Sequence, residues 1–123
     1  MEKRIKIGSK EFNMSSSAYT QFKYKNDTGR SLMQDLAEFE TKYKDLLNLK
    51  EDELSTKMLG QVDEIMELVL RVAFIMANEN DRTQASTFED FLKQIDDYYS
   101  DMTWLTEVVE LATAPFQRRV QAN

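Results

Sequence analysis

The chain of 123 residues contains no cysteine and no histidine. The absence of cysteine excludes disulfides and thiol nucleophiles, and the absence of histidine excludes zinc fingers and histidine-dependent catalytic triads. With three glycines and one proline, the chain also lacks the residues that form the turns of all-β proteins and the glycine-rich loops of nucleotide sites. These absences predict a protein that is not an enzyme, needs no cofactor and acts by contact.

Acidic side chains are the remaining candidates for catalysis or metal binding. Asp96, Asp97 and Asp101 lie close in the sequence, and Asp97 and Asp101 would be one turn apart on a helix. A hard-cation site needs several converging oxygen ligands, usually with a tight glycine turn between them. No glycine lies nearby, so we interpret this cluster as a solvated acidic surface and predict no metal site.

Charge is unevenly distributed in a chain whose net charge is −6. Residues 1–30 carry seven basic and three acidic side chains, whereas residues 31–123 carry nine basic and nineteen acidic ones. The acidic part would repel phosphate, so we expect no nucleic-acid binding. The opposite signs favour head-to-tail contact between copies, which predicts a homo-oligomer that weakens with salt. The alternative is a solvated surface with a chance asymmetry.

Apolar runs in this chain are short. The longest, residues 68–77, is interrupted by Arg71 and has about half the length of a membrane span. The N-terminus has no apolar stretch of the kind found in secretory signals. We therefore expect a cytoplasmic protein with no membrane contact.

Alternation of apolar and polar residues predicts a β-hairpin over residues 3–14. The period of two on both sides of a turn at residues 8–10 is typical of paired strands. Because an isolated hairpin is only marginally stable in water, it must pack on helices or pair with another copy. Its apolar face would consist of Ile5, Ile7, Phe12 and Met14.

Two helices are expected after the hairpin. Residues 15–17 offer serine N-caps for a short helix, and Gly29 can adopt the left-handed conformation that ends it. Ser31 with Gln34 has the spacing of a capping box and predicts the start of the next helix. Helical spacing assigns to the core the apolar and aromatic residues Tyr19, Phe22, Tyr24, Leu32, Leu36 and Phe39.

The second half of the chain predicts three more helices. A helix over residues 54–77 is apolar nearly all round, which indicates a central position. After a loop at residues 78–86, Thr87 with Asp90 three residues later predicts the start of a helix that extends to Tyr99. A last helix, which carries Trp104, would end or kink near Pro115.

The predicted fold class is therefore mainly α, with about five helices and a short N-terminal β-hairpin. Leu, Ile, Val and Phe make up about a quarter of the chain, enough for one core. The length also fits one small domain. We expect a single domain over residues 1–123, composed of the hairpin (3–14), a helical body (16–115) and a polar tail (116–123).

The order and spacing of four segments resemble a known family. They are the turn with Gly8 and Lys10, the segment TGRSL at 28–32, the segment RVAFIMA at 71–77 and the segment TFEDFL at 87–92. In these features the chain resembles the tail assembly chaperones of long-tailed phages and prophages of Gram-positive bacteria. The resemblance covers about residues 3–115, and none of its segments is a catalytic motif.

The resemblance implies a non-enzymatic chaperone for the phage tape measure protein. Such proteins coat the long, apolar, helical tape measure protein, keep it soluble and are displaced as tail tube protein polymerises around it. This implies action in the cytoplasm of the bacterial host and absence from the mature virion. A small acidic inhibitor or mimic that blocks a basic host partner is one alternative, and another structural or head–tail joining protein is a second.

A client of this kind would be bound as an apolar helix in a groove, with methionine and aromatic side chains in contact and acidic residues at the rim. The candidate contact residues lie on or beside the last helix. Burial in the core is the alternative for Trp104, because sequence alone does not separate a core anchor from an interface anchor. The predicted partner-binding residues are Met102, Trp104, Leu105, Val108 and Phe116.

Overall fold

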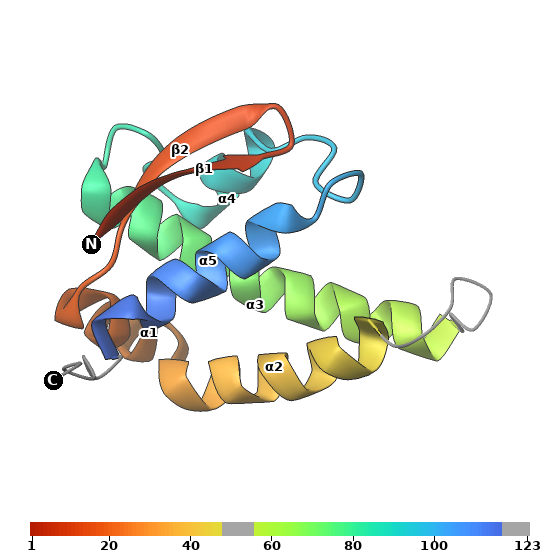
Figure 1. Cartoon of the computed structure of the whole chain (residues 1–123). Helices are drawn as coiled ribbons and strands as arrows, with labels where there is room; N and C mark the ends of the chain where they lie inside the picture. Colours follow the sequence, from red (N-terminus) through yellow and green to blue (C-terminus); the bar gives the residue numbers. More distant parts are fainter. Residues whose placement is uncertain (48–55, 117–123) are drawn as a thin grey trace, which may run out of the picture.

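The structure of the protein is a computed structural model that describes residues 1–47 and 56–116, with side chains described for residues 1–42 and 63–116. Over these residues it contains an N-terminal hairpin, five α-helices and a short 3-10 helix (Figure 1). The predicted mainly α class with an N-terminal hairpin is therefore confirmed. The elements are β1 (Glu2–Ile7), β2 (Lys10–Ser15), α1 (Ala18–Thr28), α2 (Leu32–Leu47), α3 (Thr56–Asn80), α4 (Phe88–Lys93), α5 (Thr103–Thr113) and the 3-10 helix Ala114–Phe116.

The hairpin packs its apolar face on the helices. β1 and β2 pair antiparallel with Ile5 opposite Phe12, and the predicted apolar face is fully buried. β2 lies against α3 and β1 lies against α5, as Figure 1 shows at the top of the molecule. Contact with the helical body therefore provides the support that an isolated hairpin lacks.

Local capping determines both ends of α1. The Ser17 hydroxyl accepts a hydrogen bond from the Tyr19 backbone N–H at 3.1 Å, and Thr20 completes a capping box. Gly29, at φ +74°, donates its N–H to the Lys25 carbonyl at 2.8 Å. Both predicted ends of the helix are thus confirmed.

The predicted core position of two α1 aromatics is wrong. Tyr19 is 49% exposed and Phe22 is 69% exposed, whereas Tyr24 is buried. The helix packs on α2 and α3. Tyr24 lies on its buried side, whereas Tyr19 and Phe22, three residues apart, share the opposite, exposed face.

α3 is the central helix, as predicted. Figure 1 shows it running through the middle of the molecule, and it contacts the hairpin, α1, α2, α4 and α5. Its buried side chains, among them Val69, Val72 and Met76, therefore face several elements. It extends to Asn80, so the predicted loop is shorter than residues 78–86. The predicted start at residue 54 and the tail from residue 117 lie outside the described residues.

α4 is shorter than predicted. Thr87 is its N-cap, as expected, and accepts a hydrogen bond from the Asp90 N–H at 3.0 Å. The helix ends at Lys93 instead of continuing to Tyr99, because the next residues are held by the hairpin turn. The Asp96 carboxylate accepts hydrogen bonds from the Ser9 N–H at 2.8 Å and the Ser9 hydroxyl at 2.7 Å.

The acidic residues of this segment each accept a hydrogen bond within the molecule. The two hydrogen bonds from Ser9 hold the pKa of Asp96 below its ordinary value. Asp97 accepts a hydrogen bond from the Ser100 hydroxyl, and Asp101 accepts one from the Thr103 N–H at 3.0 Å. Asp97 and Asp101 therefore do not share a helix face, and their oxygens serve as acceptors that fix a loop.

Candidate functional site

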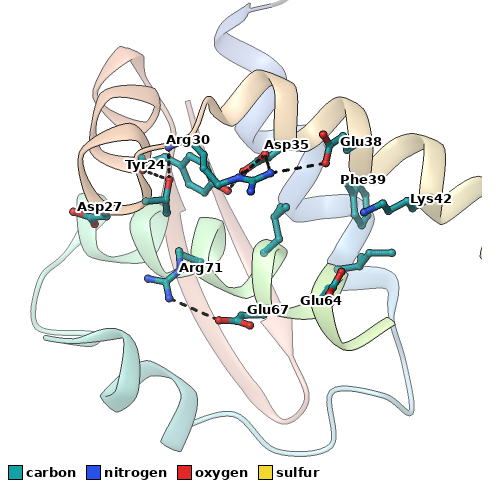
Figure 2. A pocket seen from close by; sticks show the side chains of 13 residues that line it. Tyr24, Asp27, Arg30, Asp35, Glu38, Phe39, Lys42, Glu64, Glu67 and Arg71 are labelled. Carbon is teal, nitrogen blue, oxygen red and sulfur yellow. Dashed lines mark hydrogen bonds and ion pairs between the residues drawn. The ribbon is translucent and has the colours of Figure 1, made fainter. Parts of the chain in front are cut away.

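Within the described part of the chain, two neighbouring depressions are each lined by several residues of α3. The polar cleft, between α1, α2 and α3, has a volume of about 540 Å³ and is drawn in Figure 2. The apolar groove, between α3, α4 and the segment that follows α4, has a volume of about 320 Å³. Glu67 lines both, so the two depressions are neighbours on the two sides of α3.

A buried carboxylate organises the polar cleft. Asp35, in the first turn of α2, is 2% exposed. It accepts a hydrogen bond from the Tyr24 hydroxyl of α1 and hydrogen bonds from two nitrogens of Arg30, with Nε at 3.0 and 2.9 Å from the two oxygens and a terminal nitrogen at 2.8 Å (Figure 2). This forked contact is the strong geometry for a guanidinium and a carboxylate. It links α1, the turn and α2.

In this network the pKa of Asp35 is lowered, whereas the pKa of Tyr24 is raised. Burial alone would raise the pKa of Asp35, but the hydrogen bonds from Arg30 and Tyr24 outweigh burial and hold it below its ordinary value. Burial and the hydrogen bond to Asp35 raise the pKa of Tyr24. At neutral pH Asp35 is therefore charged and Tyr24 is protonated, as the hydrogen bonds require.

The remaining charges of the polar cleft have mixed signs. Arg30 also lies 3.9 Å from Glu38, and Arg71 lies 4.0 Å from Glu67. Figure 2 shows Lys42 and Glu64 on the same walls. Because its strongest charges pair within the molecule, the cleft is best explained as the joint between α1, α2 and α3.

The apolar groove has two walls. The α3 wall carries Asp63, Met66, Glu67 and Leu70, which follow the three- and four-residue steps of one helix face. With a rise of about 1.5 Å per residue, this wall is about 10 Å long, the length of two helical turns. The opposite wall, from α4 and the residues after it, carries Phe88, Leu92, Ile95 and Tyr98.

The exposed part of the groove is its α4 wall, because Met66 and Leu70 on the α3 wall are 3% and 7% exposed and belong to the core. Leu92 is 38% exposed, whereas the adjacent Phe91 is buried against Phe12, with ring centroids 4.8 Å apart. At the rim, the Tyr99 hydroxyl donates to the Asp63 carboxylate at 3.4 Å. The Arg71 guanidinium lies 4.4 Å from the centre of the Phe88 ring. The groove is therefore an apolar trough with carboxylates on its α3 side.

Three of the predicted contact residues are buried. Trp104 is 2% exposed, and Leu105 and Val108 are fully buried. The prediction that these side chains form an exposed contact surface is wrong, because α5 packs its apolar face against α3 and β1. The Trp104 indole N–H also donates to the Tyr98 carbonyl at 2.9 Å, so Trp104 is a core anchor for the segment after α4.

Met102 and Phe116, the other two predicted contact residues, do not form one exposed surface with Trp104, Leu105 and Val108. Met102 is half-buried and packs against the core, and Phe116 is half-buried in the 3-10 helix.

The groove residues were missed as a binding surface because their helical spacing is also that of core residues. One signal was available: Phe88 and Leu92 are four residues apart and define a second apolar face beside Phe91.

Comparison with protein-family models, with curated proteins and with solved structures finds no match. The resemblance to phage tail assembly chaperones therefore stays a prediction. Among the helices of residues 1–47 and 56–116, none combines the length and the apolar character needed to cross a membrane.

Proposed function

We propose that the protein is a phage tail assembly chaperone that binds the tape measure protein and keeps it soluble while tail tube protein assembles. In this proposal it works in the cytoplasm of the bacterial host and is absent from the mature virion. The observation that supports the proposal is the apolar groove, with Leu92 exposed on one wall and Asp63 and Glu67 on the other.

The groove has the chemistry that a long apolar helix requires. Two turns of a client helix would present apolar side chains to Phe88, Leu92 and Ile95, above a floor formed by the buried Met66 and Leu70. Carboxylates at the rim keep the free groove hydrated and would repel other acidic proteins. Because the client is many times longer than the groove, several copies would bind along it.

A substitution at the centre of the groove tests the proposal. Leu92→Asp places a charge where an apolar client side chain would be buried, and loss of one buried leucine contact costs about 1.5–3 kcal/mol, or about tenfold or more in affinity. We expect at least a tenfold loss in capture of the tape measure protein when the two proteins are co-expressed and purified through a tag on the chaperone.

Met33 provides the matched control. It is an apolar residue of α2 with 41% exposure, close to the 38% of Leu92, and it does not line the groove. Met33→Asp should capture the tape measure protein as the wild type does, and circular dichroism should show the same helix content for both variants as for the wild type. Equal capture by the wild type and Leu92→Asp would contradict the proposal.

A further inference from the structure

An aromatic ridge on α1 is exposed to solvent. It consists of Tyr19 and Phe22, which are 49% and 69% exposed and lie on the face opposite the buried Tyr24. Lys25, also exposed, follows Phe22 by three residues on the same side of the helix. The α1 ridge is thus a short apolar stripe with a cation beside it.

The α1 ridge and the apolar groove are complementary in three respects. The ridge is part of a helix of eleven residues, and the groove is about two helical turns long. The ridge presents aromatic side chains, and the groove presents Phe88, Leu92 and Ile95. The ridge carries Lys25, and the groove rim carries Glu67, whose side chain is 70% exposed.

We infer that, in the absence of client, the α1 ridge of a second copy of this chain occupies the apolar groove. Phe22 cannot fill the groove of its own molecule, because it is 69% exposed there. Contact between copies would bury Phe22 and Leu92 together and place Lys25 near Glu67. Since ridge and groove are different surfaces, one copy of a pair keeps a free groove and the other keeps a free ridge, so further copies can add head to tail.

Client and second copy would then compete for the groove. This competition rests on the proposed function, whereas self-association through ridge and groove does not. In the absence of client, a second copy would cover the groove, and the client would displace that copy. Covering the groove limits exposure of an apolar surface that could otherwise aggregate.

Mixing two variants tests the inference directly. Phe22→Ser removes the ridge and leaves the groove, whereas Leu92→Asp damages the groove and leaves the ridge. In sedimentation velocity over a range of concentrations, we expect the wild type to associate and each variant alone to remain near the monomer mass of 14.4 kDa. An equimolar mixture of the two variants should form a one-to-one complex.

Several outcomes would overturn the inference. They are a wild type that is monomeric at all concentrations, a Phe22→Ser variant that associates as the wild type does, and a mixture that stays monomeric. Charge reversal gives a second measurement that does not depend on the apolar contact. Glu67→Lys should weaken association at least threefold, and addition of Lys25→Glu to that variant should restore most of the loss.

Client binding distinguishes the inference from the proposed function. Phe22→Ser should capture the tape measure protein at least as well as the wild type, because its groove is free. If Leu92→Asp loses self-association but still captures the tape measure protein, the proposed client site is wrong and the inference stands. If Phe22→Ser loses client capture as well as self-association, the α1 ridge binds the client and competition for the groove is overturned, whereas self-association stands.

Discussion

Asp35 is the residue on which the joint between α1 and α2 depends. Its carboxylate is buried, and burial of an unpaired charge would be costly. Arg30 supplies a forked ion pair and Tyr24 supplies a hydroxyl donor, so the carboxylate oxygens are satisfied. All three residues lie within 24–35, which means that the turn at Gly29 brings the partners together.

Replacement of Tyr24 tests this joint. Tyr24→Phe keeps the buried ring and removes one hydrogen bond to a charged acceptor, a contact that contributes about 1.5–3 kcal/mol to the free energy of unfolding. We expect a loss of that size in urea unfolding at neutral pH. Tyr19→Phe is the control, because the Tyr19 side chain is 49% exposed and the free energy of unfolding should change by less than about 0.5 kcal/mol. Equal effects would show that the Tyr24 hydroxyl does not stabilise the joint.

Two glycines with positive φ have different roles in the elements that they join. Gly29 ends α1 at φ +74°, and a Cβ there would meet no atom within 4 Å. Gly8, in the hairpin turn at φ +64°, lies so close to the segment after α4 that a Cβ would be 1.9 Å from the Asp96 carbonyl oxygen. The hairpin turn therefore needs glycine for both conformation and space.

Alanine at Gly29 and at Gly8 separates the requirement for a left-handed conformation from the requirement for space. Gly29→Ala should lower the free energy of unfolding by about 1–2 kcal/mol, the cost of a left-handed conformation for a residue with a Cβ. Gly8→Ala should lower it by more, because the turn must also move away from Asp96 and lose the hydrogen bonds from Ser9. Urea unfolding of the two variants measures the difference. A smaller effect at Gly8 would contradict the close packing of the turn.

Helix starts could be predicted from the sequence, whereas one helix end could not. The caps at Ser17 and Thr87 depend on residues within three positions of each, so a local pattern was sufficient. The end of α4 depends on the contact between Ser9 and Asp96, which are 87 residues apart. Without knowledge of that contact, the apolar spacing predicted a helix as far as Tyr99.

The groove could not be predicted for a related reason. Phe91 and Leu92 are adjacent apolar residues, and nothing in their local sequence shows which of them is buried. The hairpin decides it, because Phe12 packs against Phe91 and turns Leu92 toward the groove. The same limit applies to Trp104, whose burial depends on the packing of α5 against β1 and α3.

At the scale of the whole molecule, part of the charge division along the chain is compensated internally. The basic hairpin packs on the acidic body. Hydrogen bonds from Thr103, with a smaller contribution from Lys6 of β1, hold the pKa of Asp101 below its ordinary value. Lys25 of α1 also belongs to the basic part of the chain, and we assign it to the contact between copies.

The apolar groove is the surface on which the proposed function depends, and hydrogen–deuterium exchange maps it in the intact protein. The proposal predicts that binding of the tape measure protein slows amide exchange in α4 and in residues 63–70 of α3. Exchange in residues 32–42 of α2, which lie outside the groove, should stay unchanged. Slower exchange in α2 without protection of α4 would contradict the proposed binding site.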